Sequence, residues 1–582
     1  MYQRRKWLSL CLAILILLTA AGCGGTTPAG ESSTPAASSA STAASSSAAT
    51  ESTSAAPAES PLPETITMFN ANPLTAPTPA WDTPIGKKIQ ELTGVRLEVE
   101  YLVGQDIMTK ANLMTAAGEY PDLVASGDNA GIFIAAQAFI PLDDLIEKHG
   151  TNIKKIYRPN ELALSKLQNG QIFTLSSNRP AVENLYPAAG YYMNLAVLKD
   201  AGYPVPKTIS EYSKLIKEYL KKNPTYNGTE NLGFSLPTEG SRASALQYGG
   251  ARFLGGYPND GPTYVDQKTL VAKLNMRGSF TKDYLYFMHD LWNDGAMDKE
   301  TFMQKDDQYL AKISSGRLLG FYDQRWAISN ALGALENTGD YERTYVAFPI
   351  VLDGIDKEYY RGSYAFAVQG VSISSSCKDP EGVFRFLDRL CADDIQKLNY
   401  WGIEGVDYTL ENGKFTRTNE QWLNSFNVEY QQTSGISQFN FLPRREGTSD
   451  ETYAKFDDGN WVNPAMNQAY NDVRYKDYEK DILKAYNVKT FCDFFAPAYP
   501  ARYEPGWAAR QKMPQDSEEF LSVQKCLDLA TEYHAKIIQA KRDDFDKLWN
   551  EYQGKLDKVP GVDGYEQAVT KIIQDGAKYY SN

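Results

Sequence analysis

Residues 190–212 read GYYMNLAVLKDAGYPVPKTISEY, and this stretch carries the clearest structural signals in the chain. Its first five residues are typical of a strand, and the apolar run that follows predicts a short helix ending at Gly202. Two prolines then predict an extended link. Thr208 and Glu211 have the spacing of a capping box, so we expect a second helix to begin there. Strand and helix therefore alternate over a short distance.

The same alternation is predicted nearer the amino terminus. Strands are expected at 65–70, 95–101 and 122–126, and helices at 84–92 and 107–117. This order favours an α/β fold, in which a sheet rich in parallel strands has helices on both faces. Ligands bind such sheets beyond the carboxyl ends of the strands. The candidates at those ends are Asn70, Asn72, Ser126 and Asp128.

Residues 201–211 (AGYPVPKTISE) resemble a signature of the extracellular solute-binding proteins of ABC importers, in the class that includes maltose-binding protein. Further segments resemble this family in the same order along the chain: 316–321, 347–350, 371–381 and 401–405. The last of them, WGIEG, resembles a motif of the long lipoprotein-type branch. The resemblance covers most of Pro63 to Asn582 and weakens after Phe441.

The resemblance implies a periplasmic-binding-protein-like fold, with two α/β lobes joined by a hinge and a helical carboxyl-terminal extension. Lobe 1 would comprise 63–185 and 361–405, and lobe 2 would comprise 186–360 and 406–582. The lobes would close on a solute and deliver it, as a monomer, to the permease subunits of an ABC transporter. We expect an oligosaccharide, because long members of this branch are commonly associated with sugars.

Ligand contacts are expected from aromatic, amide and charged side chains near strand ends. Aromatic faces stack on the apolar faces of sugars, and planar polar groups bind the hydroxyls. The best candidates are expected to follow a strand that ends at Phe321; they are Tyr322, Asp323, Arg325 and Trp326. Weaker candidates are Trp81, Tyr191, Tyr192, Asn194, Trp401 and Glu404. For each one the alternative is a packed core aromatic or a solvated charge.

Two other classes of function stay open. A peptide or another small solute could bind the same fold. A surface polysaccharide-degrading enzyme needs two carboxylates placed on either side of the glycosidic bond that it cleaves. A chain with 72 acidic residues can supply such a pair. No nucleophile elbow, phosphate-binding loop or zinc-protease motif occurs, so we predict no enzymatic activity. Removal of residues 1–22, which carry three basic and no acidic residues, would change the net charge from −13 to −16, and the acidic body that remains has no basic run and is not expected to bind nucleic acid.

No metal or cofactor is predicted. The three histidines are isolated, and no cysteine–histidine cluster has metal spacing. Segment 223–233 stands where long family members carry a calcium loop, but Glu230 is its only charged residue. Calcium needs several oxygen ligands with carboxylates among them, so we predict that the site is lost. Cys377, Cys391, Cys492 and Cys526 allow three disulfide pairings, although Cys391 lies on the apolar stripe of a helix expected to begin at Asp379.

The amino terminus is predicted to direct the protein out of the cell. A basic start at residues 4–6 precedes an apolar run at 7–18 and small residues before Cys23. This pattern resembles a bacterial lipoprotein signal peptide, 1–22, after which Cys23 would carry lipid such as palmitate. An ordinary secretion signal is the alternative. Residues 23–62 are rich in Ser, Ala, Thr and Pro and are expected to form a disordered linker. The protein would thus be anchored on the outer face of the cell membrane.

Overall fold

The computed structural model describes residues 61–74, 80–103, 107–167, 169–177, 185–363, 370–445 and 451–580. The predicted signal peptide, Cys23 and nearly all of the predicted linker lie outside these residues. Side chains of Asn72 and Asp128 also lie outside the description, although their backbones are included. No helix among the described residues is both long enough and apolar enough to cross a bilayer.

The first sheet has five strands in the order β2-β1-β3-β14-β4. Its strands are β1 (Thr65–Leu74), β2 (Arg96–Val103), β3 (Leu123–Ala125), β14 (Gly370–Ile373) and β4 (Leu175–Ser176). Strand β1 pairs in parallel with β2 and β3, and β14 runs antiparallel to β3 and β4. The three strands expected from the amino-terminal sequence are confirmed, including their parallel arrangement.

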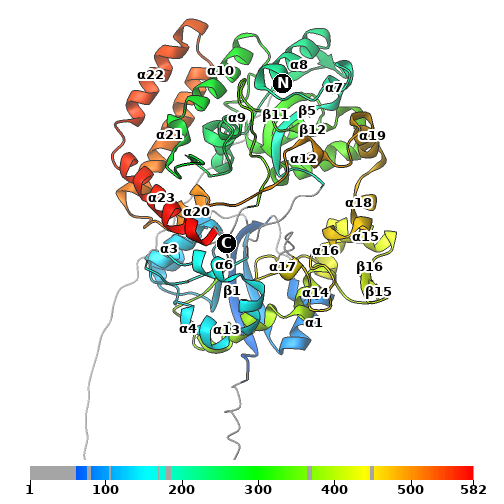
Figure 1. Ribbon diagram of the computed structural model, residues 1–582, viewed down its shortest axis with the longest axis vertical. Coiled ribbons are helices and arrows are strands. Elements are labelled where there is room, and N and C mark those ends of the chain that lie inside the picture. The colour runs from blue at the N-terminus through cyan, green and yellow to red at the C-terminus, as the bar shows by residue number, and fades with distance from the viewer. Residues whose placement is uncertain are drawn as a thin grey trace, which may run out of the picture. The chain divides into compact units, whose positions relative to one another are not determined.

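Short helices surround this sheet (Figure 1). They are α1 (Pro84–Thr93), α2 (Ile107–Ala117), α3 (Ala130–Ala135), α4 (Asp143–His149), α5 (Thr151–Ile156), α6 (Pro159–Leu164), α13 (Pro380–Leu390) and α14 (Asp393–Tyr400). Helix α13 begins as its sequence indicates, because the Asp379 side chain accepts the Gly382 N–H at 2.9 Å and Pro380 occupies the first turn. Cys391 packs in the same core, and all four described cysteines are free thiols.

The second sheet has four strands in the order β12-β5-β11-β8. They are β12 (Tyr345–Phe348), β5 (Ala189–Asn194), β11 (Leu318–Gln324) and β8 (Leu232–Phe234). Strand β5 is antiparallel to both β11 and β12. The prediction that the strand ends at Phe321 is wrong, because Tyr322, Asp323 and Gln324 continue the ladder opposite residues 191–189.

The helices of this half include α7 (Leu195–Asp200), α8 (Ile209–Lys222), α9 (Gly250–Leu254), α10 (Ser279–Asn293), α11 (Asp306–Ser314) and α12 (Arg325–Asn337). Helix α8 has the expected capping box of Thr208 and Glu211. Two hairpins, β6–β7 (Thr225–Tyr226, Thr229–Glu230) and β9–β10 (Thr263–Val265, Ala272–Leu274), project from the connections.

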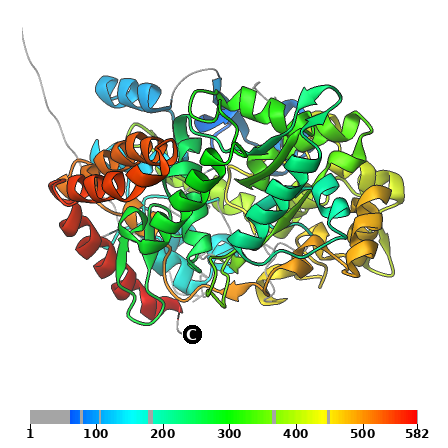
Figure 2. The ribbon, with the colours of Figure 1, turned by 90° about the horizontal axis from the view of Figure 1, so that it is seen from above.

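The carboxyl-terminal third is mainly helical. It contains α15 (Asn419–Phe426), α16 (Val428–Ser434), α17 (Glu451–Ala454), α18 (Gln468–Arg474), α19 (Asp477–Tyr486), α20 (Gly506–Gln511), α21 (Glu518–Ile538), α22 (Phe545–Leu556) and α23 (Val562–Gly576). Helices α21 and α22 lie beside each other, and α21 also packs on α10 (Figures 1 and 2). The expected helical extension is confirmed, and α21–α23 share one hydrophobic core with the second sheet.

Two features connect segments that are distant in sequence. Residues 436–442, which the predicted division places in lobe 2, contribute Ile436, Phe439, Phe441 and Leu442 to the core of the first sheet. Strand β13 (Gly362–Ser363) pairs in parallel with β17 (Tyr499–Pro500). The lobe boundaries stay a prediction, but the packing of 436–442 favours placing that segment with lobe 1.

Candidate functional site

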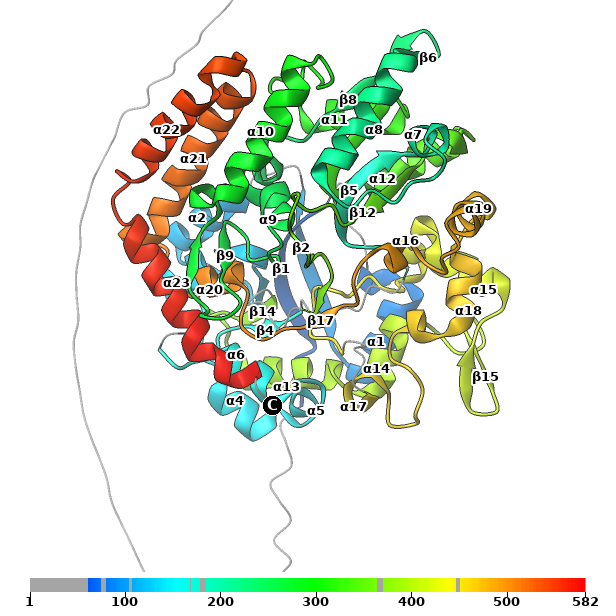
Figure 3. The ribbon, with the colours of Figure 1, turned by 45° about the horizontal axis from the view of Figure 1, so that its top comes forward.

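A cavity of about 680 Å³ lies where strand β11 passes into helix α12. Its walls come from four parts of the chain: residues 237–252, the loop 259–262, the β11–α12 junction, and residues 507–520. Helices α9 and α20, which carry two of these walls, are both visible in Figure 3. The volume lies within the range of about 300–1,000 Å³ that is usual for small-molecule sites.

The cavity has aromatic walls. Tyr248, Tyr322, Trp326, Trp507 and Phe520 line it. Trp326 is 71% exposed although it is a large apolar side chain, and its indole N–H donates to the Gln324 side chain. That hydrogen bond restrains the ring while its face remains open to solvent. An exposed aromatic with a polar tip is suited to a ligand that has both apolar faces and hydroxyls.

One acidic residue of the wall, Asp323, is occupied by protein donors. Its Oδ2 accepts from the Arg242 guanidinium at 2.6 Å and from the Tyr309 hydroxyl at 2.9 Å. Its Oδ1 accepts the Gln324 N–H at 2.7 Å. Burial raises the pKa of Asp323 to about 6, and the charge of Arg242 opposes that rise. Arg242 also pairs with Asp306 at 3.1 Å, so the guanidinium bridges two carboxylates.

Two further arginines line the cavity. Arg252 is 2% exposed, and its Nη1 donates to the Gly261 carbonyl at 3.1 Å. The Arg510 guanidinium lies 4.2 Å from the centre of the Phe520 ring. Helix α20, which carries Arg510, is held against the 259–262 loop because Asp260 accepts the Gly506 N–H at 3.0 Å.

Of the predicted residues, Tyr322, Asp323 and Trp326 line this cavity. Arg325 does not, although it lies between two residues that do. Its guanidinium stacks 3.6 Å from the centre of the Tyr186 ring and lines, with Tyr192, a separate cavity of about 40 Å³. The reason is geometric: Arg325 opens helix α12, where successive side chains point about 100° apart.

Four other predicted residues are core or framework side chains. Trp81 packs edge-on against Phe386 and Phe439 in the core of the first sheet. Trp401 is 1% exposed and donates to the Trp461 carbonyl at 2.9 Å. Tyr191 is buried in the core of the second sheet. Asn194 caps helix α7 and donates to two backbone carbonyls. These four side chains thus have framework contacts in this structure, and their part in ligand binding stays a prediction.

The remaining predicted residues lie elsewhere. Glu404 is exposed on a turn that follows α14. Ser126 is buried directly after β3, as expected, but the prediction that the first strand ends at Asn70 is wrong, because β1 continues to Leu74 beside β2 and Asn70 is buried within it. The first sheet nevertheless comes close to the cavity wall: a Cβ atom on Gly131 of α3 would lie 2.1 Å from Nε2 of Gln515. Glycine at 131 thus permits α3 to approach the wall.

Sequence reasoning missed the other half of the wall. Arg242, Arg252, Trp507, Arg510 and Gln515 follow no predicted strand. Trp507 was the one detectable signal, because a tryptophan next to glycine in a polar segment is a candidate for a surface aromatic. The contacts that place it, such as the Asp260–Gly506 hydrogen bond, join residues far apart in sequence.

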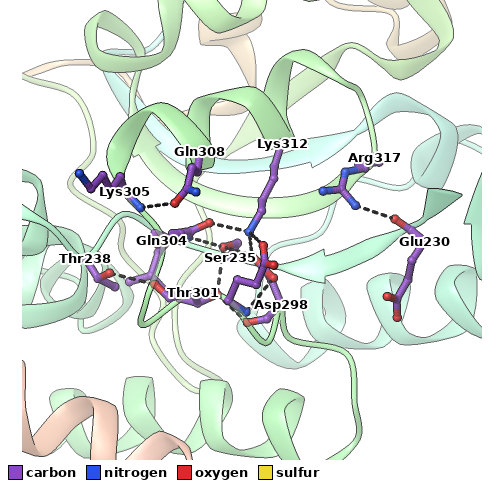
Figure 4. Close-up of polar contacts among 12 residues, drawn as sticks. Glu230, Ser235, Thr238, Asp298, Thr301, Gln304, Lys305, Gln308, Lys312 and Arg317 are labelled. Atoms are coloured by element: carbon purple, nitrogen blue, oxygen red, sulfur yellow. Dashed lines mark hydrogen bonds and ion pairs between the residues drawn. The ribbon is translucent and has the colours of Figure 1, made fainter. Parts of the chain in front are cut away.

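Segment 223–233 forms a tight hairpin. Asn227 and Gly228 have φ of 48° and 76°, the left-handed geometry of a two-residue hairpin turn. Arg317 donates to the Glu230 carbonyl at 3.4 Å (Figure 4). No group of three or more His, Cys, Asp or Glu side chains with metal-binding geometry occurs among the described residues. The loss of calcium binding stays a prediction.

Close to this hairpin lies a buried polar network (Figure 4). The Lys312 ammonium contacts Asp298 at 2.7 Å, Glu300 at 2.8 Å and the Gln304 side-chain oxygen at 2.8 Å. The Ser235 hydroxyl donates to Asp298 at 3.0 Å. Lys312 therefore ties helix α11 to the 298–304 loop, and Ser235 ties the same loop to the end of β8. None of these residues lines the cavity.

Comparison with known proteins adds independent information. The sequence profile of the family described as bacterial extracellular solute-binding protein matches residues 72–397. Lipoprotein LipO of Bacillus subtilis is 24% identical over 464 residues, which cover 76% of this chain and 81% of that protein. The fructooligosaccharide ABC transporter substrate-binding protein FusA of Streptococcus pneumoniae is 24% identical over 360 residues, or 59% of this chain and 64% of its own length.

Solved structures share the fold. FusA in complex with kestose superposes with a TM-score of 0.60 at 19% identity, covering 88% of this chain and 99% of that chain. A human-milk-oligosaccharide (HMO) binding, ABC-transporter-associated protein of Bifidobacterium longum infantis has a TM-score of 0.61 at 16% identity, with coverage of 89% and 99%.

Proposed function

This chain belongs to the bacterial extracellular solute-binding protein family, and from that premise we propose that it captures an oligosaccharide in the cavity beside β11 and delivers it to an ABC permease. The observation that carries the proposal is the exposed Trp326 ring on the wall of a cavity of about 680 Å³. An exposed indole beside a polar pocket offers an apolar face for stacking together with a polar N–H tip, which suits a sugar.

The names of the similar proteins support a sugar. FusA is named as a fructooligosaccharide-binding protein and was solved with kestose, and the Bifidobacterium protein is described as binding milk oligosaccharides. These ligands belong to those proteins. What transfers to this chain is the class of ligand, which agrees with an aromatic wall interleaved with amide and charged groups.

Capture would proceed by closure of two lobes. The cavity wall comes from the half that contains the second sheet, and α3 of the first sheet lies next to Gln515. A ligand that contacts both halves would stabilise the closed arrangement by its extra contacts there. Asn70 and Asn72 of β1, together with Ser126 and Asp128 after β3, are the proposed source of contacts from the first half. The permease would receive the closed form.

The protein would work as a monomer on the outer face of the membrane, held by lipid on Cys23 after removal of residues 1–22 and separated from it by the linker 23–62. Its similarity to a Bacillus lipoprotein supports this location. Binding and delivery need no catalysis, so we propose a carrier without enzymatic activity and without nucleic-acid partners.

A binding screen tests the proposal. Purified protein would be mixed with neutral oligosaccharides, acidic oligosaccharides and peptides, and its unfolding temperature measured, because a ligand that binds only the folded state raises it. We expect at least one oligosaccharide to raise the midpoint and no peptide to do so. A shift with peptides alone would contradict the proposal, and release of products from a polysaccharide would contradict the non-enzymatic role.

A further inference from the structure

The charge of the cavity wall is opposite to that of the whole chain. The chain has a net charge of −13, whereas the described residues of the wall include three arginines, Arg242, Arg252 and Arg510, and a single acidic residue, Asp323. Arg242 and Asp323 pair with each other at 2.6 Å. The other two arginines therefore leave this part of the wall with a net positive charge.

Arg252 is a buried cation that forms no ion pair with a described residue. Its Nη1 donates to the Gly261 carbonyl and its Nε has no partner, and no carboxylate of the described residues pairs with it. The Asp260 carboxylate acts on the Arg252 charge without forming an ion pair, and the two Asp260 oxygens accept the Gly506 N–H and the Tyr503 hydroxyl, each at 3.0 Å. A buried charge is costly unless it is paired with an opposite charge. The wall therefore lacks a carboxylate that pairs with Arg252, and a ligand could supply one.

Arg510, on helix α20, is the second arginine of the wall that forms no ion pair with a described residue. Its guanidinium stacks at 4.2 Å on the Phe520 ring, which fixes the plane of the group. Its Nε is buried without a partner, and no carboxylate among the described residues forms an ion pair with it. Stacking uses the face of a guanidinium and leaves the N–H edge for a ligand.

We infer that the ligand is an acidic oligosaccharide whose uronate carboxylates bind Arg252 and Arg510. This inference rests on the proposed function and specifies its ligand class. The planar fork of a guanidinium matches the two oxygens of a carboxylate, a match that neutral hydroxyls do not offer. The sugar rings would stack on Trp326 and the other aromatic side chains of the wall, as the rings of a neutral oligosaccharide would. The two arginines thus select for charge, and the aromatics select for a sugar.

The test compares each acid with its own neutral derivative. Galacturonate, mannuronate and guluronate oligomers, their methyl esters, neutral oligosaccharides of equal length and a peptide set would be titrated calorimetrically into the mature protein. We expect an acidic oligomer to bind most tightly of the panel and its methyl ester to bind at least tenfold more weakly. This comparison uses the wild-type protein and does not depend on how any variant folds.

Variants then assign the contacts. Arg510→Met and Arg252→Met should each weaken the acid at least tenfold and change the affinity for the ester little. Arg542→Met is the matched control, because that arginine pairs with Asp290 and Asp294 away from the cavity and should leave both affinities unchanged. Arg252→Lys, which keeps the charge but not the fork, should fall between wild type and Arg252→Met.

The outcomes separate the two proposals. A neutral oligosaccharide that binds as tightly as the best acid, or an ester as tight as its acid, would overturn the acidic-ligand inference and leave the oligosaccharide proposal standing. Binding of peptides alone, or of nothing in the panel, would overturn both. Equal losses for acid and ester in the Arg510→Met variant would also overturn the inference, since the arginine would then act through shape.

Discussion

The Lys312 ammonium lies 2.7 Å from the Asp298 carboxylate, and both side chains are almost completely buried, at 5% and 3% exposure. The pair joins helix α11 to the 298–304 loop, and its remaining hydrogen-bonding capacity is taken up by Gln304 and Ser235. A buried pair of this kind is costly to break, because removing one partner leaves the other charge in a low-dielectric environment.

Lys312→Met should therefore lower the free energy of unfolding by about 3–5 kcal/mol. Denaturant-induced unfolding would measure the change, and the further substitution Asp298→Asn should recover part of it. Lys571→Met is the control, because Lys571 and Asp575 form an exposed pair and its loss should cost less than about 0.5 kcal/mol. Equal effects at the two lysines would show that the buried network does not stabilise the loop.

Trp326→Ala should weaken oligosaccharide binding about tenfold or more, which corresponds to about 1.4 kcal/mol, because it removes the exposed wall of the cavity. The ring packs little, so the free energy of unfolding should change by less than about 0.5 kcal/mol. Tyr286→Ala serves as a control, since Tyr286 is also an exposed aromatic but does not line this cavity. Unchanged calorimetric affinity in Trp326→Ala would remove that residue from the site.

Trp401→Ala should behave in the opposite way. Its ring packs against Phe415 and Trp422 in a buried cluster, so truncation should cost about 3–5 kcal/mol of stability. The fraction that remains folded should bind ligand with wild-type affinity. A selective loss of affinity at normal stability would return Trp401 to the list of ligand contacts.

The pH dependence of stability tests Asp260. Burial raises the pKa of Asp260 to about 6, from an ordinary value of 3.8, despite hydrogen bonds from Gly506 and Tyr503 and the nearby charge of Arg252. Because the pKa of Asp260 is higher in the folded state, the folded protein binds this proton at a higher pH than the unfolded chain does. Its contribution to stability is thus full below the ordinary pKa and is lost as pH rises through about 6.

Between pH 7 and pH 4 this group should increase the free energy of unfolding by roughly 2 kcal/mol, which is most of the roughly 3 kcal/mol that the whole pKa shift gives at about 1.4 kcal/mol for each unit. Asp260→Asn cannot take up the proton, so the difference in unfolding free energy between wild type and variant should grow in favour of wild type as pH falls. Asp323, whose pKa is raised in the same direction, titrates in both proteins and cancels in that difference. Parallel curves for the two proteins would contradict the assignment.

Cys23→Ala tests the anchor. Wild-type protein expressed in a bacterium that processes lipoproteins should incorporate labelled palmitate and sediment with membranes, because several acyl chains on one residue give stable anchoring. The variant should carry no label and leave the membrane fraction. Cys377→Ala is the control and should keep both properties, whereas a labelled Cys23→Ala protein would contradict the proposed site.

Local patterns were sufficient for much of the fold. Alternating and 3.6-residue periodicities correctly located β1, β2, β3, α1, α2 and β5, and the capping pairs at Thr208 and Asp379 correctly located two helix starts. They misplaced the end of β11, because its last residues are held in the sheet by pairing with β5, which no local pattern encodes. Local patterns also did not determine burial. Trp326 follows a strand and Trp401 precedes a glycine-rich segment, yet Trp326 is exposed and Trp401 lies in a core.

The sequence by itself determined the family, the α/β class, the helical carboxyl-terminal third and an aromatic at 326, because each of these follows from neighbouring residues or from an ordered set of motifs. The tertiary structure alone decided which side chains share the cavity. Asp260 holds the Gly506 backbone and thereby brings Trp507 and Arg510 to Arg252, Tyr322 and Trp326. Spacing along the chain cannot reveal such a wall, since a cavity is formed by long-range packing, and long-range packing depends on the whole core.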